Sequence, residues 1–191
     1  MCGRYVVKSP SAKLKVKFHL DDAPLFEPRY NVAPTQLVPA VRQEDGKRRL
    51  VTLRWGLIPS WAKDAKIGYR LINARADTVA AKPSFRSAFK RRRCLVPADG
   101  FYEWKRSGTL KQPFFIHRKD EEPFAFAGLW EGWENPEDGK DVQRRPLTKS
   151  RSFTPSANSS APAAAPGIAG GCAESSSRSR SRSILYEQTR A

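Results

Sequence analysis

Residues 92–104 read Arg-Arg-Cys-Leu-Val-Pro-Ala-Asp-Gly-Phe-Tyr-Glu-Trp, and this stretch indicates the fold class. Two short runs with the composition of strands, at 93–97 and 101–105, are separated by a segment that contains the turn-forming pair Asp99 and Gly100. A connection this short cannot hold the crossover helix that parallel strands require. Antiparallel pairing is therefore predicted.

The same close spacing recurs along the chain from Tyr5 to about Val142. Pro and Gly separate further apolar or alternating runs, which predict strands at 37–42, 49–55, 113–117 and 124–130. Short helices are predicted at 12–18, 78–81 and 83–89. The expected fold is α+β, with a mostly antiparallel, barrel-like sheet and a few short helices.

The character of the chain changes after Asp141. Residues 142–183 are rich in Ser, Ala, Pro and Arg and contain almost no large apolar side chain, so they bury too little to offset the entropy of ordering. We expect residues 142–191 to be a disordered, low-complexity basic tail. Its Arg-Ser run at 178–183 either touches nucleic acid without sequence preference or is only a solvated tail.

Charge and cysteine content narrow the class of protein. The 191 residues carry a formal net charge of +16, an excess that favours a polyanionic partner such as nucleic acid over a merely solvated basic surface. The three cysteines form neither a disulfide framework nor a C-x-x-C metal pair, so we expect no metal, no cofactor and a reducing compartment. No apolar run is long enough to cross a membrane and no signal peptide is evident, so the expectation is a cytoplasmic, nucleoid-associated protein with no membrane partner.

Cys2 is the candidate nucleophile, because removal of Met1 would leave it as the amino terminus. Its amine, with a reference pKa of about 7.7–8.0, and its thiol, at about 8.5, are then both partly nucleophilic near neutral pH. The amine can form an imine with an aldehyde, and the thiolate can close on the imine carbon to give a thiazolidine. The alternative is an inert cysteine that acts as a small hydrophobe.

Five separated motifs agree in order and spacing with one family. They are Cys-Gly-Arg-Tyr at 2–5, Tyr-Asn-Val-Ala-Pro-Thr at 30–35, Trp-Gly-Leu-Ile-Pro-Ser-Trp at 55–61, Ile-Asn-Ala-Arg-Ala-Asp-Thr at 72–78 and the stretch at 92–104. Together they resemble the SOS-response-associated peptidase (SRAP) family of abasic-site processing proteins over residues 2–141. A set of five motifs is far more specific than a single short pattern.

The resemblance implies a β-barrel-based α+β fold, single-stranded DNA as partner, and a covalent thiazolidine between Cys2 and the ring-opened sugar of an abasic site. It thus implies an enzyme with Schiff-base, lyase-like chemistry in a family named as peptidases (hydrolases), acting in the DNA-damage and SOS response, and we expect a monomer. The matching catalytic positions are Cys2, Asn73 and Glu103. The predicted DNA-binding residues are Arg4, Asn31, Pro34, Trp61, Arg75, Phe85 and Arg86.

Elementary chemistry supports several of these assignments. Glu103 could serve as the acid or base that opens the hemiacetal of an abasic deoxyribose, although it also fits a surface glutamate on a strand. Asn73 and Arg75 lie two positions apart and so share a face of an extended segment. Arg4 and Arg75 offer forks suited to phosphate, or equally to a carboxylate in a structural ion pair. Trp61 is the tryptophan predicted to contact DNA, with burial in the core as its alternative.

The resemblance ends near residues 142–144. The family's His-x-Arg-Met-Pro segment, whose histidine assists catalysis, has no counterpart, and both His19 and His117 are interpreted as structural. We expect the domain to be C-terminally incomplete, with sheet edges and apolar faces left uncovered. Two other functions stay open: an autoproteolytic cysteine peptidase, and an inactive truncated or frameshifted member that retains only nucleic-acid binding.

Overall fold

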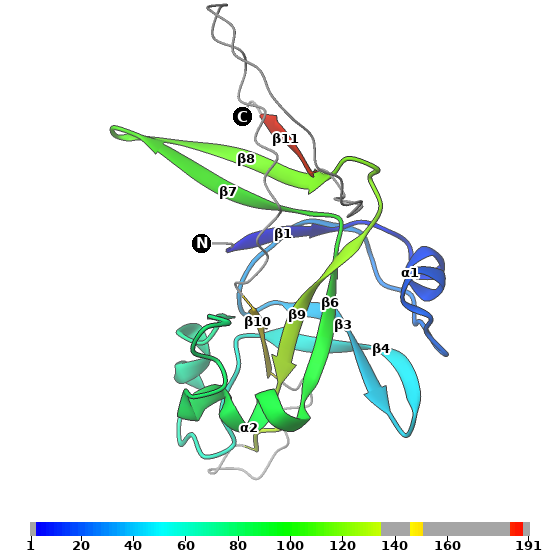
Figure 1. Cartoon of the computed structure of the whole chain (residues 1–191), viewed down its shortest axis with the longest axis vertical. Coiled ribbons are helices and arrows are strands. Elements are labelled where there is room, and N and C mark those ends of the chain that lie inside the picture. Colours follow the sequence, from blue (N-terminus) through cyan, green and yellow to red (C-terminus); the bar gives the residue numbers. More distant parts are fainter. Residues whose placement is uncertain (1–2, 135–145, 151–183, 189–191) are drawn as a thin grey trace, which may run out of the picture.

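The computed structural model describes residues 3–134, 146–150 and 184–188, which form two β-sheets and two short α-helices (Figure 1). One sheet has the strand order β11-β8-β7-β1-β2 and the other has the order β4-β3-β6-β9-β10-β5. The first sheet consists of β1 (Arg4–Val7), β2 (Arg29–Val32), β7 (Gly100–Ser107), β8 (Leu110–Arg118) and β11 (Ile184–Gln188). The second consists of β3 (Leu37–Glu44), β4 (Lys47–Trp55), β5 (Asn73–Ala74), β6 (Arg93–Ala98), β9 (Phe124–Trp130) and β10 (Pro146–Ser150).

These elements confirm the α+β prediction. All six predicted strands are present, and the helices are α1 (Ser11–Phe18), α2 (Pro83–Arg91) and a short 3-10 helix, η1 (Ala65–Tyr69). The described strands form two sheets, and in the second sheet β10 also pairs with β4, which joins the strands β4-β3-β6-β9-β10 into a ring. The barrel-like description therefore applies loosely, to this sheet alone.

The helix predicted at 78–81 is wrong, because this segment forms turns. Its turns are closed by hydrogen bonds such as Val79 N to Arg75 O at 2.9 Å and Lys82 N to Thr78 O at 3.0 Å. Lys82 is extended, with a ψ of 127°, because the ring of Pro83 disfavours the helical conformation in the residue before it. The turns therefore cannot continue into α2.

The main core lies between the two sheets and is built from alternating residues of their strands. Tyr5 of β1 is fully buried, and its ring packs edge-to-face on Trp55 and Phe126 with centroids 5.6 and 6.0 Å apart. The indole N–H of Trp55 donates to Ile72 O at 2.6 Å, so the buried ring keeps its polar group satisfied. Burial of Tyr5 and Val7 anchors the first strand of the chain in the centre of the fold.

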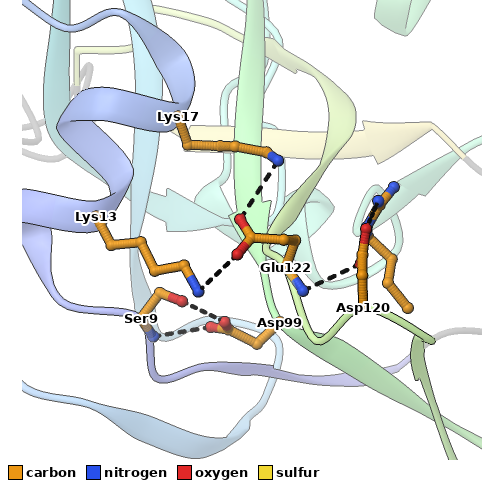
Figure 2. Close-up of polar contacts among 7 residues, drawn as sticks. Ser9, Lys13, Lys17, Asp99, Asp120 and Glu122 are labelled. Carbon is orange, nitrogen blue, oxygen red and sulfur yellow. Dashed lines mark hydrogen bonds and ion pairs between the residues drawn. The ribbon is translucent and has the colours of Figure 1, made fainter.

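Asp99 links this first strand to the corner where the chain passes from the second sheet to the first. It is 5% exposed and lies between β6 and β7. Its carboxylate accepts hydrogen bonds from Ser9 N at 2.9 Å and Ser9 Oγ at 2.5 Å (Figure 2). It also accepts one from Lys8 N at 2.6 Å. Its own amide donates to Val6 O at 2.8 Å, so both ends of Asp99 hold the end of β1.

Gly100 follows at the start of β7, where β8 approaches closely. A Cβ at this position would lie 2.3 Å from the ring of Phe115 and 2.9 Å from Ile116 O. The register pairs Gly100 with His117 on β8 and with Val6 on β1. A glycine is therefore required for β7 to fit between β1 and β8.

Two segments of the C-terminal region take part in the sheets. β10 pairs antiparallel with β9 and parallel with β4 and β5, and β11 pairs antiparallel with β8. The sequence predicts uncovered sheet edges without saying which. In the structure the edges of β8 and β9 are paired, because the unpaired backbone groups of an edge strand can pair with strands of almost any sequence. The rest of the predicted tail lies outside the described residues, and its disorder stays a prediction.

Replacing Asp99 with alanine should destabilise the whole domain. Three donors at the end of β1 would lose a buried charged acceptor, and hydrogen bonds to charged groups are among the strongest, so we expect a loss of about 3 kcal/mol in unfolding free energy. Urea unfolding followed by tryptophan fluorescence measures it.

Asp120→Ala is the matched control, because this carboxylate is half exposed. A hydrogen bond from Arg118 lowers the pKa of Asp120 to about 2, but solvent screens such pairs and the expected loss stays below about 1 kcal/mol. Equal losses in the two variants would contradict the structural role of Asp99.

Candidate nucleic-acid site at the start of the first strand

The amino terminus emerges beside the middle of β7. Arg4 is the first residue of β1 and lies opposite Tyr102 in antiparallel register. Cys2 lies outside the described residues, but covalent geometry keeps its Cα about 3.8 Å from that of Gly3. Because β7 continues past Tyr102 to Glu103 and Trp104, these two residues lie next to the place where the chain begins.

Glu103 is half-buried and lines an open depression of about 350 Å³ on one face of the β7–β8 hairpin. The other lining residues are Trp104, Lys105, Phe114 and Ile116. The predicted catalytic carboxylate thus lies in a largely apolar recess, one residue along β7 from Tyr102, the register partner of Arg4. A carboxylate in this position can take up or release a proton within reach of a bound group.

Arg4 and Asn31, both predicted to bind DNA, are brought together across the β1–β2 pair. Arg4 Nη1 donates to Asn31 Oδ1 at 2.8 Å, and both side chains are exposed. The hydroxyl of Tyr102 on β7 donates to Tyr30 O on β2 at 3.3 Å, so this hydrogen bond joins the two strands that flank β1. The hydrogen bond to Asn31 orients a guanidinium that has five N–H donors in all, so the same group can also meet a phosphate.

Asn73 and Arg75 lie on the other sheet. Asn73 is half-buried in β5, and its backbone is paired with Lys149 of β10. Arg75 is exposed and binds the carboxylate of Asp77, with Nη2 to Oδ2 at 2.6 Å and Nε to Oδ1 at 3.1 Å. This hydrogen bond from Arg75 lowers the pKa of Asp77. Arg75 thus forms an ion pair within the protein, which is the alternative to the predicted phosphate contact.

The remaining residues predicted to contact DNA differ in how exposed they are. Trp61 is 60% exposed in a turn and Arg86 is exposed on α2, whereas Pro34 is half-buried in the turn between β2 and β3. Phe85 is only 3% exposed and packs with Leu57 in a small second core. Its ring is not accessible to a base, so the structure argues against the predicted contact between Phe85 and DNA.

The sequence did not reveal a row of aromatic side chains along β7 and β8. Tyr102 has its ring centroid 6.5 Å from that of Trp104 and 5.3 Å from that of Phe115, which is stacked on His117 at 5.2 Å. Residues 102 and 104 are two positions apart on β7 and so point to the same face, and residue 115 is the cross-strand partner of residue 102. To predict this row from the sequence, one would have to know the register in which β7 and β8 pair.

Cys94 and the two histidines have structural environments. Cys94 is 7% exposed, and burial raises the pKa of its thiol to about 12 although the charge of Arg42 acts in the opposite direction, so the thiol is protonated at neutral pH. Cys94 is therefore unsuited to be a nucleophile.

The two histidines lie at structural positions. His19 follows the last residue of α1 with a φ of 52°, and His117 Nδ1 lies 3.0 Å from Arg118 O.

Metal clusters and membrane-spanning helices do not occur in the described ranges. Within residues 3–134, 146–150 and 184–188, no three His, Cys, Asp or Glu side chains gather as metal ligands would. Over the same ranges, no helix has the length and apolar character needed to span a membrane.

Curated relatives match about two thirds of this chain or more. It is 48% identical over 141 residues to the abasic site processing protein YoqW of Bacillus subtilis, an alignment that covers 72% of this chain and 63% of YoqW. It is 33% identical over 150 residues to the abasic site processing protein HMCES of Xenopus tropicalis, covering 63% of this chain and 45% of HMCES. The chain thus spans less than two thirds of the length of these relatives.

The fold is also similar to those of solved structures. A protein from Bacteroides thetaiotaomicron superposes with a TM-score of 0.70 at 27% identity, covering 78% of this chain and 67% of that one. The sequence pattern of the family described as SOS response associated peptidase matches residues 1–160. The chain therefore belongs to the SOS response associated peptidase (SRAP) family.

Proposed function

We propose that this protein captures abasic sites in single-stranded DNA as a covalent adduct on Cys2 once Met1 has been removed. The observation that supports the proposal is the register of β1, whose first residue, Arg4, pairs with Tyr102, the neighbour of Glu103 in β7. The family names of the relatives agree with abasic-site processing. Capture takes place in the cytoplasm, at the nucleoid, by a monomer without a cofactor.

The proposed reaction balances with the groups that Cys2 supplies. Its α-amine adds to the C1 aldehyde of the ring-opened deoxyribose, and loss of water gives an imine. The thiolate sulfur then adds to the imine carbon, forming the C–S bond while a proton moves to the nitrogen. The product is a five-membered thiazolidine that joins protein to DNA without any oxidant or reductant.

Glu103 is proposed as the proton-transfer group of this sequence. An abasic sugar is mostly a closed hemiacetal, and opening it needs a proton at the ring oxygen and loss of one from the hydroxyl. The half-buried setting of Glu103 in a recess lined by Trp104, Phe114 and Ile116 limits the water around the carboxylate. We assign Asn73 the role of orienting the sugar.

The DNA strand is proposed to lie over exposed basic and aromatic side chains around this point. Arg4, oriented by Asn31, contacts a phosphate, and Trp61 offers a platform for a base. Arg86 adds charge from α2. Arg75 reaches DNA by exchanging one carboxylate oxygen of Asp77 for a phosphate oxygen, which its fork can accommodate.

The cysteine peptidase and the inactive binding module are the competing functions. A peptidase would use Cys2 on a peptide bond and give no aldehyde-dependent adduct. A binding module would hold DNA with or without a lesion and release it on denaturation. One experiment separates the three: incubation with matched oligonucleotides that contain or lack an abasic site, followed by denaturing electrophoresis.

Cys2→Ser should abolish the heat-stable adduct, because a hydroxyl closes poorly on an imine. The matched control is Cys94→Ala, which removes a buried thiol and should leave the adduct yield unchanged. Gel quantification after heating measures both. An undiminished heat-stable adduct in Cys2→Ser would falsify the thiazolidine assignment.

Glu103→Gln should slow adduct formation by about 10²–10⁴-fold while DNA affinity changes little, because the amide keeps the size of the side chain but cannot act as a general acid or base. The control is Glu121→Gln, an exposed position in the β8–β9 connection. Single-turnover time courses give the rate and fluorescence anisotropy gives the affinity. If Glu103→Gln weakened binding and left the rate alone, the acid–base role would be wrong.

Arg4→Ala and Arg75→Ala should each lower the salt dependence of binding to lesion-free single strands. Each phosphate that a variant no longer neutralises reduces the slope of log K against log salt by about 0.7. Lys119→Ala, exposed in the turn that follows β8, is the charge-matched control and should keep the slope. Unchanged slopes in both arginine variants would remove them from the DNA path.

A further inference from the structure

The second sheet contains a groove where β3 and β6 diverge. These strands share a single register pair, Val41 with Leu95, and beyond it they separate. The opening is a depression of about 270 Å³. It is lined by Val41, Arg42, Gln43, Arg48, Arg93, Cys94 and Leu95. Three arginines from three strands therefore surround one cavity, and none of its lining residues is acidic.

Arg42 forms the fixed wall of this groove. It is 5% exposed, and its guanidinium carbon lies 3.8 Å from the ring centroid of Trp130. Its Nη2 is paired with Glu44, two residues along β3. A guanidinium held by a carboxylate and an aromatic face has little side-chain entropy left to lose when an anion binds.

Arg48 and Arg93 supply positive charge at the mouth of the groove. Arg48 is exposed on β4, with Nη1 donating to Phe18 O at 3.3 Å, and Arg93 is exposed at the first position of β6. Glu44 offsets the charge of Arg42, so two positive charges remain around the cavity. Arg48 and Arg93 both line the opening, and planar guanidinium forks match the oxygen geometry of a phosphate group.

We propose that this groove is an anion site that binds a phosphate group, separate from the Cys2 site on the other sheet. Arg48 and Arg93 donate to the phosphate oxygens at the mouth, and Arg42, already paired with Glu44, lines the base. The phosphate comes either from a nucleic-acid backbone or from a small phosphate compound, since both present the same oxygens.

The first experiment measures binding of inorganic phosphate to the full chain, by thermal unfolding and calorimetric titration at constant ionic strength with chloride as the reference anion. Phosphate should raise the melting temperature of the wild type. Arg48→Gln combined with Arg93→Gln should weaken phosphate binding at least about tenfold, because hydrogen bonds to charged groups are worth an order of magnitude or more in affinity.

The matched control is Arg49→Gln combined with Arg91→Gln. These residues are also exposed, lie next to the tested pair in sequence, remove the same charge and do not line the groove. The control should bind phosphate like the wild type. Absence of a phosphate effect in the wild type, its persistence in the groove variant, or its equal loss in the control would each overturn the site.

A second arm identifies the source of the phosphate. Lesion-free single-stranded oligonucleotide does not require Cys2 chemistry, so this arm is independent of adduct formation. If the site takes a nucleic-acid phosphate, the groove variant should bind the oligonucleotide with a salt slope lower by about 0.7 per contact, and the control should not. If it takes a small phosphate compound, inorganic phosphate binds and both variants keep the oligonucleotide slope of the wild type.

Discussion

The buried carboxylate of Asp99 is the interaction on which the arrangement of the two sheets depends. It lies where the chain leaves β6 for β7, and it accepts three hydrogen bonds from the two residues that follow β1. A buried carboxylate without these donors would carry a desolvation penalty far larger than that of an exposed one. Breaking the interaction would therefore release the end of β1 and the corner between the sheets together.

The ion pairs around this corner are weaker and more local. Lys13 and Lys17 of α1 contact Glu122 at 3.1 and 3.4 Å, but all three side chains are between 31% and 41% exposed (Figure 2). Such pairs contribute at most about 1 kcal/mol each. They position α1 over the β8–β9 connection, whereas Asp99 holds the end of β1. Capture of an aldehyde by the first residue of a mature chain needs the amino terminus to be held, because orientation supplies much of the rate of such reactions.

The sequence predicted the six longer strands because their alternation and turn residues are local signals. β1 and β2, of four residues each, are too short to show a period, and they form because Tyr5 and Val32 are buried between neighbours distant in sequence. The motifs predicted that Arg4 and Asn31 belong to the same DNA-binding site, but they did not predict the hydrogen bond between the two side chains. The burial of Phe85 and the groove at Arg42 depend on how strands pack and diverge, which no local pattern encodes.

The 35 Lys and Arg side chains overstate the number of positive charges that this protein can offer to DNA phosphates. Arg42, Arg75 and Arg118 each bind a carboxylate two residues along the chain. Arg42 and Glu44 lie two positions apart on β3 and so share a face, whereas Asp77 and Asp120 lie in turns close to their arginines. All three ion pairs therefore form between near neighbours in the sequence. Counterion release depends on the phosphates actually contacted and not on formal charge. The salt dependence of binding should therefore follow the number of arginines that contact phosphate. An arginine that is paired with a neighbouring carboxylate contributes to this number only if its guanidinium can bind the carboxylate and a phosphate at the same time.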